Sequence, residues 1–321
     1  MDALWIISAV FGFLAIVFLA LCYAAYRRAF YAVPNPQYVP YQVPNSPQYQ
    51  EHKDALLTLI GELDSLPYES VYITSHDGLK LHGKYYHFRD GAPVHIDMHG
   101  YRSSGVRDFC GGARILKALG HNAIIIDERA HSKSEGNTIT FGIKERYDCL
   151  DWINYAIDRF GKDTPIFISG VSMGAGTVLM ASGLELPENV KGVFADCPFS
   201  APWDIIKKVC RDIGLPHKLC FPFGYVAAGL FGGFKLTETS AKEAVKNAKV
   251  PILIIHGDDD RLVPHDMSVE IRDANPKMVR LVTVHNAGHA LAYFRDPELY
   301  ERTVIDFFND CLTGGQNNEN I

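Results

Sequence analysis

The pattern of apolar and polar positions divides the chain into three parts. Residues 3–25 form an apolar run without a charged side chain, and residues 29–50 are rich in proline. From residue 51 to about residue 313, short apolar runs alternate with amphipathic stretches. These patterns predict a membrane-spanning helix, an extended tether and a folded domain of alternating strands and helices, in that order along the chain.

The apolar run is long enough for a membrane anchor. As a helix with a rise of 1.5 Å per residue it extends over about 35 Å, which exceeds the hydrocarbon thickness of a bilayer. Trp5 lies near one end, and Tyr23 and Tyr26 lie near the other, where aromatic side chains meet the membrane interface. We assign residues 1–28 to a single-pass anchor. The alternative is a cleaved signal peptide, which usually has a basic leader and a shorter apolar core.

The charges beside the run predict its orientation. Arg27 and Arg28 follow the run directly, whereas Asp2 precedes it. Because basic residues favour the cytoplasmic side, we expect the N-terminus outside and the folded domain on the cytoplasmic side of the membrane.

The proline-rich part, residues 29–50, predicts a tether. Five prolines exclude a continuous helix or a central strand, namely Pro34, Pro36, Pro40, Pro44 and Pro47. We expect an extended spacer that makes few contacts with the domain, so that a chain starting near Glu51 stays active. A recognition role for the Pro/Tyr repeats is the alternative. Residues 51–66 then place leucines at helical spacing, which predicts a short amphipathic helix on the domain edge.

The third part predicts an α/β domain with a mostly parallel sheet. Residues 71–74 and 79–88 flank the turn His76-Asp77-Gly78 and predict a hairpin. Continuous apolar runs, typical of strands buried on both faces, follow at 94–98, 123–126, 166–169, 192–195, 252–255 and 280–284. Helical stretches lie between and after them at 109–119, 143–159, 173–182, 268–274 and 297–311. Ligands of such sheets bind beyond the carboxyl ends of the strands, so the residues that follow each strand are the informative ones.

Composition narrows the possible functions. The chain of 321 residues is 47% hydrophobic and 21% charged, which excludes wholesale disorder and a polytopic membrane protein. A net charge of −6 gives no reason to expect a nucleic-acid partner. The seven cysteines include no CxxC pair, so they suggest neither a zinc site nor a disulfide framework, and free thiols fit a reducing compartment.

A serine lies in the turn between the 166–169 strand and the 173–182 helix. The sequence there is Gly170-Val171-Ser172-Met173-Gly174, which matches G-x-S-x-G in strand–turn–helix context. The glycines allow a strained turn that projects the hydroxyl, because side chains at their positions would collide with neighbouring backbone. We therefore take Ser172 as a candidate nucleophile. The alternative is a structural turn that happens to contain a serine.

A serine nucleophile requires a base, which in this motif follows later in the chain. After the 280–284 strand comes Gly288-His289, and His289 is the base that we choose. His285 is the competitor, but it belongs to the strand end and is less freely placed.

The acid that orients the base is expected between the serine and the histidine. The loop after the 252–255 strand contains Asp258, Asp259 and Asp260. Periodicity does not decide among the three, although adjacent like charges resist shared burial, so not all of them point inward.

The negative oxygen of an acyl-transfer transition state requires backbone donors. The N–H of Met173, which follows the nucleophile, is the first. The strand 94–98 ends in His99-Gly100-Tyr101, and we expect the Tyr101 N–H to be the second donor. Gly100 allows close approach of this backbone, and we expect His99 to order the loop.

These motifs together resemble the α/β-hydrolase superfamily. From about residue 68 to 311 the chain looks like the membrane-anchored bacterial members grouped with serine aminopeptidase-like (S33-type) and BEM46-like hydrolases. The motifs that carry the resemblance are Asp77-Gly78-Leu79-Lys80-Leu81, His99-Gly100-Tyr101, residues 127–136, the Ser172 turn, His256-Gly257 with Asp260 and Val263-Pro264, and Gly288-His289. The family pattern H-G-x-x-D-x-x-V-P implies that Asp260 is the acid. One departure is Ala130-His131-Ser132, where relatives usually carry small glycines.

The resemblance also interprets residues 199–239, which interrupt the alternation of strands and helices. This segment is rich in apolar and aromatic residues, which suits a helical lid over a hydrophobic pocket, and its prolines and glycines are expected to break it into short pieces. The alternative is that these side chains only pack on the sheet.

The sequence thus predicts a membrane-anchored serine hydrolase with an α/β-hydrolase domain over 51–313 and a disordered tail over 314–321. Its site is Ser172, Asp260 and His289, with oxyanion donors at Tyr101 and Met173, and it needs neither metal nor cofactor. We expect a monomer that acts on a small hydrophobic acyl substrate, preferably a carboxylic ester. The chemistry leaves thioesters and amides open. The alternatives are an aminopeptidase-like amide hydrolase, or an inactive membrane-tethered binding protein on the same fold.

Overall fold

The computed structural model describes residues 2–35 and 41–314, so Pro36, Pro40 and most of the expected tail lie outside the described residues. Its centre is one eight-stranded sheet with the order β1-β2-β4-β3-β5-β6-β7-β8. The strands are β1 (Glu69–Thr74), β2 (Lys80–Tyr86), β3 (Val94–Met98), β4 (Asn122–Ile126), β5 (Ile166–Val171), β6 (Val190–Asp196), β7 (Ile252–Gly257) and β8 (Val279–Val284). The hairpin and all six later strands agree with the apolar pattern.

The direction of the strands decides where the candidate site residues meet. β1 and β2 pair antiparallel, and β2 joins β4 antiparallel. All pairs from β4 through β3, β5, β6 and β7 to β8 are parallel. The carboxyl ends of β3, β5, β7 and β8 therefore share one edge of the sheet, and the loops that follow these four strands lie side by side there.

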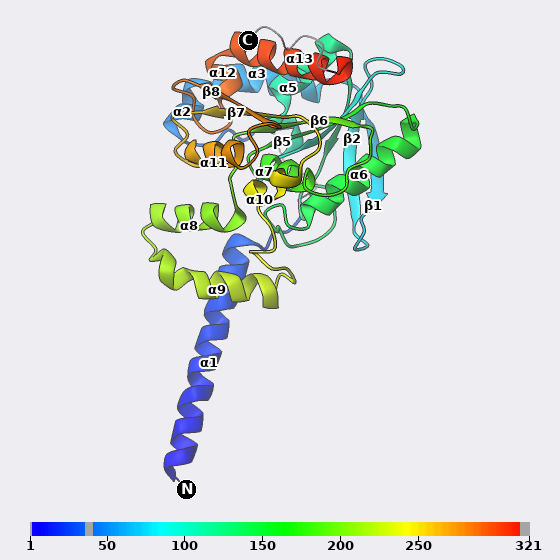
Figure 1. Cartoon of the computed structure of the whole chain (residues 1–321). Coiled ribbons are helices and arrows are strands. Elements are labelled where there is room, and N and C mark those ends of the chain that lie inside the picture. Colours follow the sequence, from blue (N-terminus) through cyan, green and yellow to red (C-terminus); the bar gives the residue numbers. More distant parts are fainter. Residues whose placement is uncertain (1, 36–40, 315–321) are drawn as a thin grey trace.

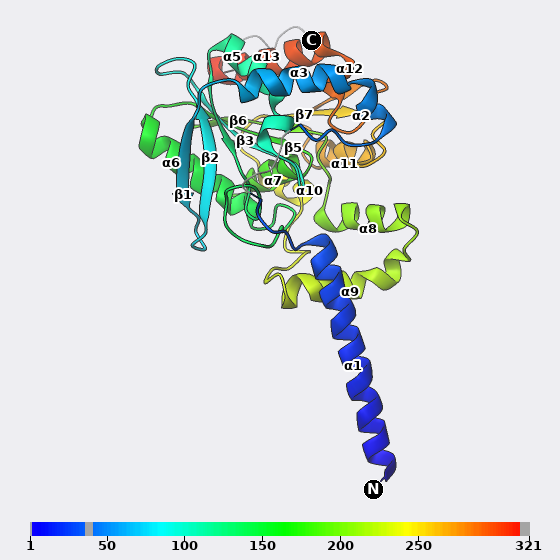
Figure 2. The same ribbon diagram turned by 180° about the vertical axis from the view of Figure 1, so that it is seen from behind.

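Helices cover both faces of the sheet (Figures 1 and 2). One face carries α6 (Glu145–Phe160), α7 (Met173–Ala181), α10 (Ala241–Ala244), the 3-10 turn Val245–Asn247 and α11 (Asp266–Ala274). The other face carries α3 (Lys53–Asp64), α4 (Gly105–Asp108), α5 (Cys110–Leu119), α12 (Ala292–Arg295) and α13 (Pro297–Thr313). The predicted α/β three-layer fold is confirmed.

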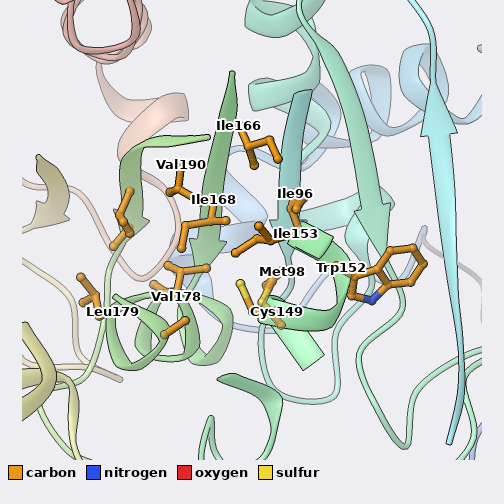
Figure 3. Close-up of a cluster of buried hydrophobic side chains, with 14 of the residues drawn as sticks. Ile96, Met98, Cys149, Trp152, Ile153, Ile166, Ile168, Val178, Leu179 and Val190 are labelled. Atoms are coloured by element: carbon orange, nitrogen blue, oxygen red, sulfur yellow. The ribbon is translucent and has the colours of Figure 1, made fainter. Parts of the chain in front are cut away.

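The core lies between the sheet and these helices. Figure 3 shows the cluster on the first face, where Ile96 and Ile168 of the sheet meet Val178 of α7 and Ile153 of α6. Every residue of β3, β4 and β5 is buried, which explains why these strands have continuous apolar runs rather than alternating ones. The buried core holds β5 and α7 rigidly, and the turn with Ser172 joins these two elements.

The N-terminal helix α1 (Asp2–Ala29) projects away from the domain (Figure 1). Among the described residues it is the one helix that is long and apolar enough to cross a membrane, over Ala3–Ala29. Its last turns pack against the rest of the chain. Cys22 and Tyr26 are buried there, as is Phe30, which directly follows the helix.

The expected lid segment, residues 199–239, forms two helices, α8 (Pro202–Asp212) and α9 (His217–Leu230). They stand apart from the sheet, and α9 crosses α1 (Figure 2). The Phe18 and Phe223 rings lie 5.1 Å apart, and those of Tyr23 and Phe231 lie 5.3 Å apart. The prediction of short pieces is wrong for α9, which continues through Pro222 over 14 residues, supported by its packing on α1.

The prediction of a tether with few contacts is also wrong. Ala32 N–H donates to Asn137 O, and Tyr31 forms a β-bridge with Thr138. Further on, Pro47 occupies the first turn of a short helix, α2 (Pro47–Glu51), where a missing N–H costs nothing and the fixed φ favours the helix. The spacer therefore packs onto the domain at both ends, and α2 brings it to the carboxyl edge of the sheet.

Candidate active site

Ser172 occupies a strained turn between β5 and α7. Its φ is +55°, a left-handed value that is rare for residues other than glycine. A Cβ on Gly170 would lie 2.2 Å from the Gly174 carbonyl carbon, and a Cβ on Gly174 would lie 1.9 Å from Met98 O. Backbone atoms cannot yield to such contacts, so the tight turn depends on both glycines, as the motif predicted.

His289 lies in the loop after β8 and contacts Ser172. Its Nε2 lies 2.9 Å from Ser172 Oγ, and its Nδ1 lies 2.6 Å from Asp260 Oδ2. Because a carboxylate only accepts, Nδ1 carries the proton and Nε2 is free to accept from the serine hydroxyl. His285, the competing base, instead pairs with Asp258 and has a side chain that is 83% exposed.

Asp260 is the one of the three aspartates that reaches His289. Its Oδ1 accepts the N–H groups of Leu262 and Val263 at 2.9 and 2.8 Å. Its Oδ2 accepts from His289 and also from His256 Nε2 at 3.1 Å. The buried carboxylate thus accepts four hydrogen bonds, which hold it in one orientation.

The other two aspartates point elsewhere. Asp258 accepts from His285 and from the Asn286 N–H, and Asp259 accepts from Gln48 and Arg261. The turn after β7 therefore separates three adjacent carboxylates that the sequence pattern alone left unresolved.

The electrostatics of the pair favour a charged aspartate beside a basic histidine. Burial raises the pKa of Asp260, but the His289 charge and the hydrogen bonds from His256 and His289 outweigh it and hold the pKa well below its usual range. Burial lowers the pKa of His289, but the charge of Asp260 and its hydrogen bond outweigh it, so the net pKa is raised. A raised pKa makes this imidazole a stronger proton acceptor for Ser172.

The loop after β3 lies directly against the serine. A Cβ on Gly100 would lie 3.5 Å from Ser172 Cβ, so the backbone of this loop passes at van der Waals distance. His99 orders the loop, because its Nδ1–H donates to Gly100 O and its Nε2 accepts from the Glu128 N–H. Met173 is the first residue of α7, where N–H groups lack intrahelical acceptors.

A cavity of about 520 Å³ opens above Ser172 and His289. Tyr101 and Leu262 line it from the domain, and Pro44, Gln48 and Tyr49 line it from the spacer. Its volume is in the range of small-molecule sites.

Three residues of the site were missed in the sequence. His256 orients Asp260, and Asp108 accepts the Gly100 N–H at 2.8 Å. Gln48 donates to Asp259, and its side chain occupies the position that a Cβ on Gly288 would need. His256 is signalled by its place in the His256-Gly257 motif, whereas nothing in the local sequence indicates Gln48 or Asp108.

Two groups of side chains have donor atoms close enough for a metal ion among the described residues. The first consists of Cys197, Asp260 and His289, but the last two already pair with each other, and burial raises the pKa of the Cys197 thiol. The second contains Asp77 and Asp148, and both of these carboxylates accept hydrogen bonds from Arg129. Neither donor set fits a metal centre better than the pairs that it already forms.

Solved structures share this arrangement of sheet and helices. The Pyrococcus furiosus esterase Pf2001 superimposes with a TM-score of 0.64 at 26% sequence identity, covering 87% of this chain and 98% of the esterase. The chain belongs to the α/β-hydrolase superfamily. Mouse alpha/beta hydrolase domain-containing protein 10, at 21% identity and a TM-score of 0.56, covers 75% of this chain and 99% of its own and shows the same fold.

Sequence comparisons lead to the same superfamily. The family model described as serine hydrolase (FSH1) matches residues 227–292, which include Asp260 and His289. The uncharacterized protein YqkD of Bacillus subtilis is 27% identical over 60% of this chain, and the lysophosphatidylserine lipase ABHD12 of Xenopus tropicalis is 26% identical over 68%. The chain spans 63% and 58% of the lengths of these two relatives.

Proposed function

We propose that the protein is a membrane-anchored serine hydrolase that cleaves carboxylic ester or related acyl bonds. The observation that carries the proposal is the continuous hydrogen-bonded chain from Ser172 Oγ through His289 to Asp260, placed in a strained turn beneath a cavity. The serine hydrolase model and the esterase neighbour support the same reaction class.

The geometry supports a reaction in two halves. His289 Nε2 takes the Ser172 proton as Oγ attacks the substrate carbonyl, and the charged imidazole keeps its Nδ1–H on Asp260. The N–H groups of Tyr101 and Met173 stabilise the negative oxygen. The tetrahedral intermediate collapses to an acyl-enzyme, and the leaving alcohol takes its proton from Nε2. Water, deprotonated by His289, then attacks the acyl-enzyme and releases the acid and free Ser172.

The cavity favours an ester over an aminopeptidase substrate. An aminopeptidase needs an anionic group to bind the free amine of its substrate. Among the described residues that line the cavity, the one carboxylate is Asp108. It accepts the Gly100 N–H, the Ser103 hydroxyl and Arg107, so its oxygens are occupied and its charge is compensated.

The contact between α1 and α9 supports a lipid-like substrate. Phe18 of α1 contacts α9, and it lies nine residues before Arg27, a distance of roughly 14 Å along a helix. If α1 spans the bilayer with Arg27 at the cytoplasmic interface, α9 lies against the acyl chains. Residues 219–230 carry no charge, and Leu230 is 60% exposed. We therefore propose that residues 199–239 form a lid facing the membrane, through which an acyl chain reaches the cavity.

The test compares the full wild-type chain with the variant Ser172→Ala. The wild type should react with a fluorophosphonate probe and hydrolyse p-nitrophenyl esters, with a preference for longer acyl chains over aminoacyl amides. Ser172→Ala should lose labelling and about a million-fold in rate, the loss seen when a serine nucleophile is removed. Activity above about 1% in Ser172→Ala contradicts the assignment. A wild type that neither labels nor hydrolyses any ester supports the inactive binding protein instead.

A further inference from the structure

The loop after β3 carries Tyr101, the proposed oxyanion donor, and we call it the oxyanion loop. Hydrogen bonds to side chains hold this loop on both sides of Tyr101. The Gly100 N–H donates to Asp108 Oδ2 at 2.8 Å, and the Arg102 N–H donates to His131 Nε2 at 3.1 Å. Tyr101 lies between them, and the Arg102 N–H belongs to the peptide group that follows Tyr101, so side chains hold the backbone on both sides of this residue. Arg102 has φ +51°, a conformation that persists only where surrounding contacts hold it.

His131 gives the departure from the family pattern a physical role. Its Nδ1–H donates to Arg129 O, which leaves Nε2 as the acceptor for Arg102. Burial lowers its pKa to about 3, so this nitrogen stays unprotonated across the working pH range. A glycine at this position has no side chain to accept the Arg102 N–H.

The side chains of the same loop bind the end of the N-terminal helix. Tyr101 Oη donates to Ala29 O at 2.9 Å. Arg102 Nη2 donates to Arg28 O at 3.2 Å and to Tyr31 O at 2.9 Å. The last carbonyls of a helix lack intrahelical partners and carry partial negative charge, so a hydroxyl and a guanidinium are well suited to satisfy them.

The end of α1 is itself fixed on the domain. The Phe30 side chain is 1% exposed and lies between Phe141 and Phe234, with ring centroids 5.9 and 5.3 Å away. Phe141 in turn stacks on the Tyr101 ring at 5.1 Å. An aromatic contact chain and three hydrogen bonds thus connect the membrane-side helix to the loop that carries the oxyanion donor.

We propose that the C-terminal end of α1 contributes to catalysis. Through Tyr101 and Arg102 it positions the oxyanion loop, so the N-terminal helix affects the turnover rate as well as the location of the protein. The inference rests on the proposed serine hydrolase function. Tyr101 and Arg102 act as positioning residues through their side chains, and the Tyr101 backbone N–H is the group that contacts the oxyanion. Movement of α1 relative to the domain then changes the turnover rate without changing Ser172, His289 or Asp260.

The test compares two double variants of the full chain in phosphatidylcholine vesicles, with p-nitrophenyl butyrate as substrate. Tyr101→Phe with Arg102→Met removes the three hydrogen bonds and keeps the backbone donor. Tyr155→Phe with Arg272→Met is the matched control, because these side chains form comparable polar contacts with Arg159 and Asp273, remote from the site. Deleting an oxyanion donor costs about 10²–10³ in kcat, so displacing one should lower kcat at least tenfold.

Two further readouts separate positioning from general damage. KM should stay within about twofold of the wild-type value, and the midpoint of the acid limb of kcat/KM should not move, because His289 and Asp260 are untouched. A kcat within twofold of the wild type overturns the inference, and so does a loss shared equally by the control. If the double variant fails to fold, Tyr101→Phe alone should still lower kcat about threefold, and an unchanged kcat overturns the inference. Activity in Ser172→Ala, measured alongside, would instead refute the proposed function.

Discussion

Replacing Asp260 by asparagine tests the acid of the proposed triad at a single atom. The Leu262 and Val263 N–H groups both donate to Oδ1, so the amide oxygen of the asparagine must occupy that position. The amide NH₂ then replaces Oδ2 and faces His289 Nδ1, which lies 2.6 Å from Oδ2 in the wild type. Two donors cannot face each other, so His289 must move its proton to Nε2.

A proton on Nε2 removes the base, because that nitrogen can no longer accept from Ser172. Stabilising the wrong tautomer in a comparable triad costs about 10⁴ in kcat. Since His256 Nε2 also faces the new amide and adds a second repulsion, we expect a loss of at least about 10⁴, or roughly 5.5 kcal/mol of transition-state stabilisation.

The assay is release of nitrophenolate from p-nitrophenyl butyrate, with thermal denaturation to show that the variant is folded. Asp258→Asn and Asp259→Asn are the matched controls, because their carboxylates bind His285, Gln48 and Arg261 outside the triad. Both should keep kcat within about fivefold of the wild type. A loss below tenfold in Asp260→Asn, or equal losses in all three variants, would refute the reasoning.

Four further predictions follow from the structure. Burial lowers the pKa of His289, but the stronger effect of Asp260 raises it, so the net pKa is raised. We therefore expect kcat/KM to rise with pH through a midpoint above the ordinary histidine pKa of about 6.5. A midpoint below about 6 in a pH–rate profile would contradict this. Gly174→Ala should lower the free energy of unfolding by about 1–3 kcal/mol and so lower Tm. Gly229→Ala is the control and should not lower Tm, because its added Cβ meets nothing within 4 Å. Equal Tm values for the two variants would argue against a backbone clash at Gly174. A chain beginning at Glu51 loses the spacer wall and the end of α1, so its kcat/KM should fall below a tenth of the full-chain value, and undiminished hydrolysis would support the passive tether instead. Protease added to intact cells should leave the domain uncut, whereas protease added after lysis should cleave it, because Arg27 and Arg28 predict a cytoplasmic domain; cleavage in intact cells would contradict this orientation.

The sequence predicted those features that local patterns determine. Buried strands appear as continuous apolar runs, and a G-x-S-x-G turn between a strand and a helix requires glycines for steric reasons that act over five residues. The positions of Ser172 and His289 follow from these patterns, since Ser172 directly follows β5 and His289 lies in the loop after β8. The choice of Asp260 needed the family spacing, because three adjacent aspartates look alike until the turn geometry separates them.

The contacts that the sequence did not reveal are those between distant parts of the chain. Gln48 and Asp259 are 211 positions apart, and no local pattern indicates that they meet. Prolines in the spacer suggested an extended tether, yet Pro47 occupies the first turn of α2, where proline is favoured. In the same way, Cys22 and Tyr26 belong to an apolar run that lipid alone would explain, and their burial against α9 depends on a helix nearly 200 residues away.

The geometry of the Ser172 turn also limits how the gene for this protein can vary. Every single-base change in a glycine codon that substitutes the amino acid introduces a residue with a Cβ. At Gly170 and Gly174 even the smallest of these, alanine, meets backbone atoms at 2.2 and 1.9 Å. Apart from synonymous changes, the two codons therefore have no tolerated single-base neighbour, and lineages that keep the activity should keep both glycines. A lineage that carries another residue at either position should have lost hydrolase activity, even where the serine itself is retained.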